Sequence, residues 1–301
     1  MLAALAKEAA ATCPIDLEHT RAIDAHVHLA TPEWLTDSMG PYQASVERYF
    51  HTTMVAGPVE AMVDTYRAAR VHGLLLAWDA ERFTGRPPLS NERVAEIAAR
   101  HPDVFTGFGS VDPARPDAVA RLHKMARLGL KGLKLHPTMQ GFLPDQERWE
   151  PFFGTAAELG FPIVVHTGTS GVGAGTPGGQ GLPLDAARPM RLDAWAARFP
   201  ALTFILAHVG WPWHLEALAM ALHKTNVYID ISGWRYKYLP DEVLRELRGR
   251  LSQQFLFGTD FPMFDLGRQL DDFDALELPP AVRRRVLVGN AATLLWGAGT
   301  A

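Results

Sequence analysis

The chain has 301 residues, of which 48% are apolar and 21% charged, so it is long enough to bury one large core. Its 29 basic and 33 acidic residues give a formal net charge of −4, which argues against a nucleic-acid partner and against an anionic membrane surface. Cys13 is the only cysteine, which excludes an intrachain disulfide and is typical of a reducing compartment, so we expect a cytoplasmic protein.

The first residues do not resemble a targeting signal. Residues 1–11 are rich in alanine, but Lys7 and Glu8 interrupt the apolar run, so the segment makes a poor secretory signal and cannot span a bilayer. We expect a short helix there, within an N-terminal extension of residues 1–20. Nothing else in the sequence demands a second domain, and we expect a single domain over residues 1–301.

The segment Ile23–Leu29 predicts a buried β-strand. Asp24, His26 and His28 alternate with apolar residues, and this alternation places all three on one face of the strand. Two imidazoles at this spacing can converge on one metal ion, although a lone pair also occurs as surface or core residues. Residues 31–58 follow with little helical periodicity, and we expect a long loop that covers an active site.

Short apolar strands and amphipathic helices alternate through the rest of the chain. Further strands are expected near residues 73–78, 104–111, 130–136, 162–166, 202–208, 227–231 and 254–260. Helices are expected near residues 59–71, 90–100 with Ser90 as the cap, 116–128, 149–159, 190–199, 213–224, 241–251 and 279–288, with a final turn at 290–296. Eight such units predict a single (β/α)8 TIM barrel, with a long loop after strand 1 and a glycine-rich loop after strand 5.

Polar side chains end five of the eight predicted strands: His28, His136, His166, His208 and Asp260. The carboxyl ends of barrel strands meet at one face and carry the chemistry of this fold, so we expect these side chains to converge. Each one also has a structural interpretation. The histidines would then be hydrogen-bonded strand-end residues, and Asp260 would cap a helix.

Four motifs, in this order, resemble those of the amidohydrolase superfamily. They are His26-Val27-His28, Val164 to Gly168, Leu206 to Gly210 and Gly258 to Pro262, and the likeness extends from about Ala22 to Trp296. Within the superfamily the chain is most similar to the amidohydrolase-related branch, which includes aminocarboxymuconate-semialdehyde decarboxylase-like enzymes. The resemblance implies a mononuclear or binuclear metal site with His26, His28, His166 and Asp260 as ligands, a second-sphere or catalytic His208, and a homodimer.

Three imidazoles and one carboxylate suit one divalent metal ion, zinc in the first place, with manganese or iron as alternatives. Such an ion can lower the pKa of bound water to about 7. Asp260 can then receive the proton of an attacking water, and His208 can polarise a carbonyl oxygen. Asp260 and His208 are therefore the candidate catalytic residues.

Other residues near strand ends are candidates for substrate binding: Lys134, His136, Arg188, Trp211, Trp234 and Arg235. Lys134 either supplies a fixed positive charge to an anionic substrate or, as the resemblance implies for binuclear members, bridges two metals as a carboxylated lysine. The arginines can bind a carboxylate or lie solvated in loops, and the tryptophans can line a pocket or pack in the core. The glycine-rich segment 167–190 either forms a flexible cover or lets a substrate or phosphate approach closely.

These features predict an enzyme that acts on a small molecule. Our first expectation is a metal-dependent hydrolase of a small ester, lactone or amide. The alternative is a metal-dependent non-oxidative decarboxylase of a small unsaturated or aromatic carboxylic acid, because both reactions need one ion and one proton donor. A non-enzymatic barrel is disfavoured, since an inert protein has little reason to place five polar side chains at strand ends.

Overall fold

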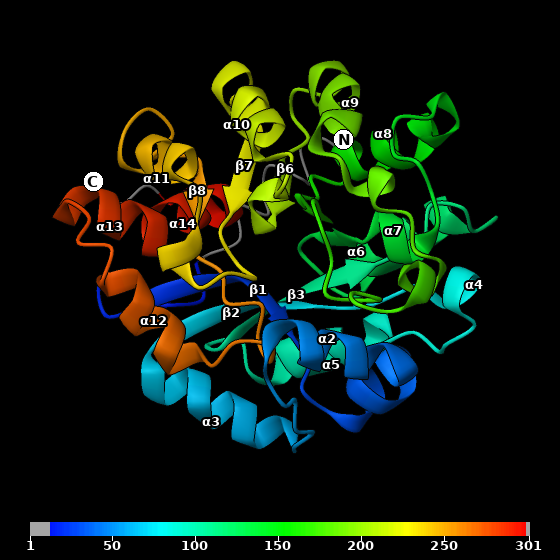
Figure 1. Cartoon of the computed structure of the whole chain (residues 1–301), viewed down its shortest axis with the longest axis horizontal. Helices are drawn as coiled ribbons and strands as arrows, with labels where there is room; N and C mark the ends of the chain where they lie inside the picture. Colours follow the sequence, from blue (N-terminus) through cyan, green and yellow to red (C-terminus); the bar gives the residue numbers. More distant parts are fainter. Residues whose placement is uncertain (1–12, 299–301) are drawn as a thin grey trace.

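The computed structural model of the chain describes residues 13–298, so the helix expected within residues 1–11 lies outside the described residues. Eight strands form one sheet in chain order, and each strand pairs in parallel with the next: β1 (Ala22–His28), β2 (Val71–Leu76), β3 (Phe105–Ser110), β4 (Leu133–Leu135), β5 (Ile163–His166), β6 (Phe204–Ala207), β7 (Val227–Asp230) and β8 (Phe255–Leu256). Backbone amides of Ala25 and His28 donate to the carbonyls of Phe257 and Phe261, at 2.9 and 2.8 Å, and thereby join the last strand to the first. The predicted (β/α)8 barrel is confirmed (Figure 1).

Helices between the strands form the outer layer of the barrel (Figure 1). They are α3 (Val59–Ala69), α5 (Asn91–Arg100), α6 (Ala118–Arg127), α8 (Glu150–Glu158), α9 (Asp193–Arg198), α10 (His214–His223) and α11 (Asp241–Arg248), with α12 (Leu266–Asp274), α13 (Pro280–Arg284) and α14 (Asn290–Trp296) after β8. The Ser90 side chain caps α5, as predicted, by accepting a hydrogen bond from the Arg93 amide. Within residues 13–298, no helix combines the length and the apolar character needed to cross a membrane.

Residues 31–58 differ from the loop that the sequence predicted. They contain a π-helix, η1 (Glu33–Met39), and the helix α2 (Gln43–Phe50). Trp34, Leu35 and Met39 of η1 are buried, as is Val46 of α2, so this segment packs its apolar residues onto the carboxyl end of the barrel. The expectation of little helical structure was wrong because the π-helix has a wider turn, which hides the ordinary 3.6-residue spacing of apolar positions.

Smaller differences concern short elements. The strands β4 and β8 have three and two residues, fewer than predicted, so that His136 directly follows β4 and Asp260 lies in the segment after β8. The short helices α4 (Glu81–Thr84) and α7 (Pro137–Gln140) follow β2 and β4. At the C-terminal end, the expected final turn is the helix α14, which continues α13 through the π-helical segment η9 (Arg285–Gly289).

One histidine far from the carboxyl end of the barrel couples stability to pH. His72 of β2 is buried, and its ring contacts the Thr106 hydroxyl at 2.8 Å and the Asp103 carbonyl at 3.3 Å. Burial lowers the pKa of His72 to about 4, although the Asp103 carbonyl opposes this shift. The unfolded chain therefore takes up a proton at this position near pH 6.5, whereas the folded chain stays neutral until about pH 4.

We expect His72 to weaken the fold as the pH falls from 6.5 toward 4. At pH 5 its contribution lowers the free energy of unfolding by about 2 kcal/mol relative to pH 7. Denaturant titrations at both pH values should show an acid loss about 2 kcal/mol larger in the native chain than in His72→Gln, whose amide can donate to Asp103 and accept from Thr106. The same substitution at the exposed His123 is the control, and an equal acid loss in the native chain and His72→Gln would contradict the prediction.

Candidate active site

A pocket lies at the carboxyl ends of the strands, and its empty space, including the part open to solvent, is about 630 Å³. Its floor, as we use the term, consists of His26, His28, Lys134, His136, His166, His208 and Asp260. Its walls are Trp34, Trp78, Trp211, Gly233 and Trp234. Its roof comes from loops and helices above the strands and consists of Met39, Val46, Tyr49, Phe50, Thr169–Val172 and Met263. The strand-end residues that the sequence singled out therefore meet in one pocket, as expected.

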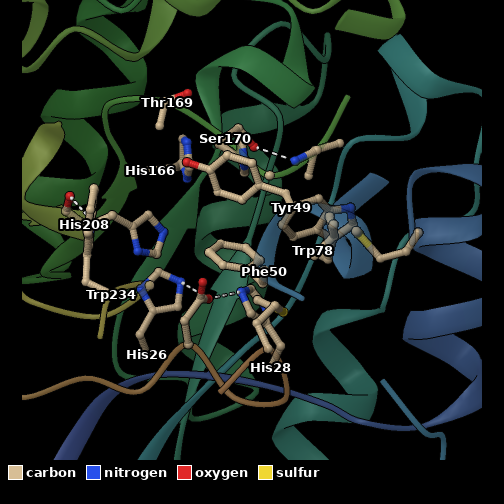
Figure 2. A pocket seen from close by; sticks show the side chains of 18 of the residues that line it. His26, His28, Tyr49, Phe50, Trp78, His166, Thr169, Ser170, His208 and Trp234 are labelled. Atoms are coloured by element: carbon tan, nitrogen blue, oxygen red, sulfur yellow. Dashed lines mark hydrogen bonds and ion pairs between the residues drawn. The ribbon is translucent and has the colours of Figure 1, made fainter. Parts of the chain in front are cut away.

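Three floor residues form a candidate metal-binding group. One ligand atom from each of His26, His28 and Asp260 lies within 4.8 Å of the others. The Asp260 Oδ1 atom is 3.6 Å from His26 Nε2 and 3.5 Å from His28 Nε2. Figure 2 draws these two contacts and shows the rings of His26, His28, His166 and His208 facing one space. Such separations are too long for good hydrogen bonds, but they suit two ligands about 2.1 Å from a shared ion.

Two contacts hold His26 from either side. Its Nδ1 atom lies 2.7 Å from Asp230 Oδ2, at the end of β7, and both side chains are fully buried. A carboxylate at this nitrogen fixes the ring so that Nε2 faces the pocket, which is the usual support of a metal-ligating histidine. On the pocket side, His26 Nε2 lies 3.0 Å from the amino group of Lys134. Asp230 was not predicted as a site residue, although an aspartate that ends an apolar strand is a usable signal in the sequence.

His166 and His136 stack on each other beside this group. Their ring centroids are 3.8 Å apart and the rings are nearly parallel, at 6°. His166 is not part of the three-residue group, but it lines the same pocket, and its buried Nε2 has no hydrogen-bond partner within residues 13–298. The fourth expected ligand is therefore present in the pocket, and its role as a ligand stays a prediction.

His208 faces the metal-binding group from the end of β6. Its ring centroid is 4.7 Å from that of His26, and its Nδ1 lies 3.2 Å from the Ser232 carbonyl and 3.0 Å from the Ser232 hydroxyl. The ring also lies tightly against Gly233, where a Cβ atom would be 2.7 Å from Nδ1. Ser232 therefore holds Nδ1, and no residue within the described part of the chain forms a hydrogen bond with the other ring nitrogen.

Backbone strain gathers at the same place. His208, Val209 and Asp260 have φ angles of 62°, 53° and 64°, a region that side chains other than glycine rarely adopt. Each such residue costs of order 1 kcal/mol and persists only where the surroundings hold it, typically at functional sites. Asp260 is not a helix cap, because the side chain that caps α12 is that of Asp265.

Burial governs the charges of the floor. It is the main cause that holds the pKa of His26, His136 and His166 well below the usual value and lowers that of His208 to about 4. Burial also lowers the pKa of Lys134 to about 8, against the opposing charges of Asp260 and Asp230. Burial would raise the pKa of Asp260, but His208, His28 and Lys134 together hold it below its usual value. The floor thus offers neutral imidazoles and an ionised carboxylate, which is the state that binds a cation.

Aromatic rings make up most of the walls. Trp34 stacks on His28 with ring centroids 4.5 Å apart, and Trp78 meets both His28 and His136 edge-on. Trp211 and Trp234 also line the pocket and contact each other edge-on, which is one of the two alternatives that the sequence left open. Trp34 and Trp78 were not singled out, because nothing in the local sequence distinguishes a pocket tryptophan from one in the core.

Two expected substrate contacts lie outside this pocket. Arg188 forms an ion pair with Glu216, and the Arg235 guanidinium pairs with Asp272, with Nη2 2.7 Å from Oδ1. Neither arginine is among the pocket residues. The expectation that they bind a substrate carboxylate needs correction, because each guanidinium already has a carboxylate partner within the protein.

Comparison with known proteins shows which family and which relatives the chain resembles. The amidohydrolase family matches residues 23–296. A gamma-resorcylate decarboxylase of Rhodococcus jostii is 24% identical over 89% of this chain and 96% of its own length. A second gamma-resorcylate decarboxylase, from Polaromonas sp., is 24% identical over 78% of this chain and 83% of its own length.

Solved structures share the fold. An uncharacterized TIM-barrel protein from Bordetella bronchiseptica has a TM-score of 0.77 at 24% identity and covers 91% of this chain and 98% of that chain. A dihydroxybenzoic acid decarboxylase from Polaromonas sp., with bound manganese and the inhibitor 2-nitroresorcinol, has a TM-score of 0.65 at 20% identity, covering 92% and 97%.

These findings overturn one expectation. The first interpretation of the sequence, a hydrolase of an ester, lactone or amide, is wrong, because the curated relatives that match the chain are decarboxylases. The physical reason for the error is that both reactions use the same set of metal ligands and a proton-transfer group. The ligand pattern, which is all that the sequence displays clearly, does not separate them.

Proposed function

Because the chain belongs to the amidohydrolase family, we propose that it is a metal-dependent, non-oxidative decarboxylase of a small aromatic carboxylic acid. The observation that carries the proposal is the pocket itself. A buried floor of imidazoles, one lysine and one carboxylate faces walls made largely of tryptophan. A flat aromatic ring fits between such walls, while its carboxylate finds positive charge at the floor. The decarboxylase relatives support the same reaction.

The floor residues fit a divalent ion. Asp260 Oδ1 and His166 Nε2 are buried without a hydrogen-bond partner in the described part of the chain, and an ion would satisfy both atoms. We assign His26, His28, His166 and Asp260 as its ligands, with Asp230 orienting His26. Manganese is the first candidate, since the related Polaromonas structure holds it, and zinc is the second. When bound, the ion supplies positive charge that binds the carboxylate and stabilises negative charge developing on the ring.

The reaction breaks the bond between the ring carbon and the carboxylate. Carbon dioxide leaves, the electron pair stays on the ring carbon, and that carbon takes up one proton. His208 is the candidate proton carrier, because Ser232 holds its Nδ1 and the other ring nitrogen forms no hydrogen bond within residues 13–298. Burial disfavours its charged form, whereas Asp260 favours it. A substrate carboxylate nearby would favour it further, so that His208 can take a proton from solvent and pass it to carbon.

Lys134 has a supporting part in this proposal. Its amino group lies 3.0 Å from His26 Nε2, deep in the pocket, where it can meet one oxygen of the substrate carboxylate. A bridge between two metal ions is the alternative, and metal quantification separates the two interpretations. One ion per chain supports the role as a fixed positive charge, and two ions, reduced to one in Lys134→Ala, support the bridge.

Carbon dioxide release tests the proposed reaction. The purified protein, loaded with manganese or zinc and analysed for metal content, would be incubated with 2,6-dihydroxybenzoate and other hydroxybenzoates. We expect one carbon dioxide and one phenol per acid consumed, and loss of turnover after chelation. Failure to release carbon dioxide from any aromatic acid, with the ion bound, would refute the proposal. The homodimer stays a prediction that the same preparation can test by light scattering.

A further inference from the structure

Among the residues that the structure describes, those that form the roof of the pocket include no charged side chain, and this limits the kinds of acid that fit. We infer that the pocket selects aromatic acids with one carboxylate and an apolar group on the far edge of the ring, and rejects acids with a second carboxylate there. This inference rests on the proposed function, which supplies aromatic acids as the substrate class. It adds a prediction of which aromatic acids bind.

The composition of the roof supports the first part. Met39, Val46, Phe50, Val172 and Met263 contribute apolar side chains. The polar atoms of roof side chains are the hydroxyls of Tyr49, Thr169 and Ser170. Ser170 is buried, and its oxygen already accepts a hydrogen bond from the Val172 amide at 3.1 Å. A methyl group in this region would leave water for an apolar surface, which is favourable.

The distribution of cations supports the second part. Of the described residues that line the pocket, Lys134 is the single lysine or arginine, and it belongs to the floor. The arginines from the loops after β5 and β7, Arg188 and Arg235, are held by Glu216 and Asp272 outside the pocket. A carboxylate at the roof would therefore lose its hydration without gaining a positive partner, and such burial is costly.

Contacts between its two main segments keep the roof together. The Gly173 amide donates to the Ser45 hydroxyl at 2.9 Å, which joins the glycine-rich loop to α2. At Gly171 an added Cβ atom would come within 2.8 Å of the Phe50 ring, so the loop packs closely against this helix. Figure 2 shows Tyr49, Phe50, Thr169 and Ser170 around the pocket that His26, His28, His166 and His208 also line. The uncharged surface is thus built from both segments.

Equilibrium binding tests the inference without turnover. Metal-loaded protein would be titrated in a calorimeter with matched pairs: 3-methylbenzoate against benzene-1,3-dicarboxylate, and 4-methylbenzoate against benzene-1,4-dicarboxylate. We expect the monocarboxylate of at least one pair to bind about tenfold tighter or more than its partner. Equal or tighter binding of the dicarboxylates, or no binding of any of the four acids, would overturn the inference.

A charge placed in the roof should reverse the preference. The quantity compared is the affinity for the dicarboxylate divided by the affinity for the matching methyl compound. We expect this ratio to be about tenfold higher or more in Val172→Lys than in the neutral control Val172→Met. Val46→Lys and Val46→Met form a second pair if the first lysine variant does not fold. No gain in any folded lysine variant would contradict our account of the roof. Selective binding of monocarboxylates without carbon dioxide release would instead refute the proposed function and leave this inference standing.

Discussion

Replacing Asp260 with asparagine should lower the rate of decarboxylation by about 10³-fold and weaken metal binding enough for the ion to be lost on dialysis. The amide has the size of the carboxylate but no charge, and its oxygen is a weaker ligand. The Asp260 Oδ1 atom, which lies 3.5 Å from His28 Nε2 and 3.6 Å from His26 Nε2, is the negative centre of the candidate metal site. Its loss leaves neutral imidazoles around the ion.

The variant should nevertheless fold. Asp260 has a φ angle of 64°, and asparagine is among the residues that tolerate this region best. Metal content measured after dialysis, together with initial rates of carbon dioxide release, tests the prediction. Asp271→Asn, a carboxylate removed from the exposed side of α12, is the matched control and should keep both metal and rate. Full metal occupancy in Asp260→Asn would remove Asp260 from our ligand set.

The barrel itself could be predicted from the sequence because its signals are local. Each strand is a short apolar run, and parallel strands buried on both faces need such runs. Polar residues such as His166 and Asp260 lie at or just beyond the strand ends, because the carboxyl end of the barrel is the place that tolerates them. Because a closed barrel places the last strand beside the first, the sequence predicts that His26, His28 and Asp260 lie close together, and this prediction needs no information about the loops.

The pocket above the floor could not be predicted in the same way, since it depends on contacts between distant segments. Trp34 lies in a π-helix whose turn does not match the usual helical spacing, and its stacking on His28 is a tertiary contact. Likewise, nothing in the sequence near Arg188 indicates an ion-pair partner, and the Arg188–Glu216 ion pair is a tertiary contact. The choice between hydrolysis and decarboxylation could not be predicted for the same reason. It depends on the residues around the metal ligands, and these come from distant segments.

Replacing His208 with asparagine should separate proton transfer from metal binding. We expect turnover to fall by about 10²–10⁴-fold, while the metal content stays at the native level. The asparagine amide can keep the contact of Nδ1 with the Ser232 carbonyl, now 3.2 Å, but it has no second nitrogen in the position of the imidazole that faces the pocket. Its backbone tolerates the φ angle of 62° at this residue, so a folding defect is not expected.

The controls for His208 follow from its neighbours. Ser232→Ala removes the hydroxyl contact at 3.0 Å and keeps the carbonyl contact, so the ring stays in position and turnover should fall less than about tenfold. Metal quantification and initial rates of carbon dioxide release, taken on the same preparations, distinguish the outcomes. Loss of the ion from His208→Asn would make His208 a ligand, and an unchanged rate would require another proton donor. In that case Lys134, whose amino group lies 3.0 Å from His26 Nε2 and whose pKa is lowered to about 8, is the floor residue that carries a proton for the ring carbon.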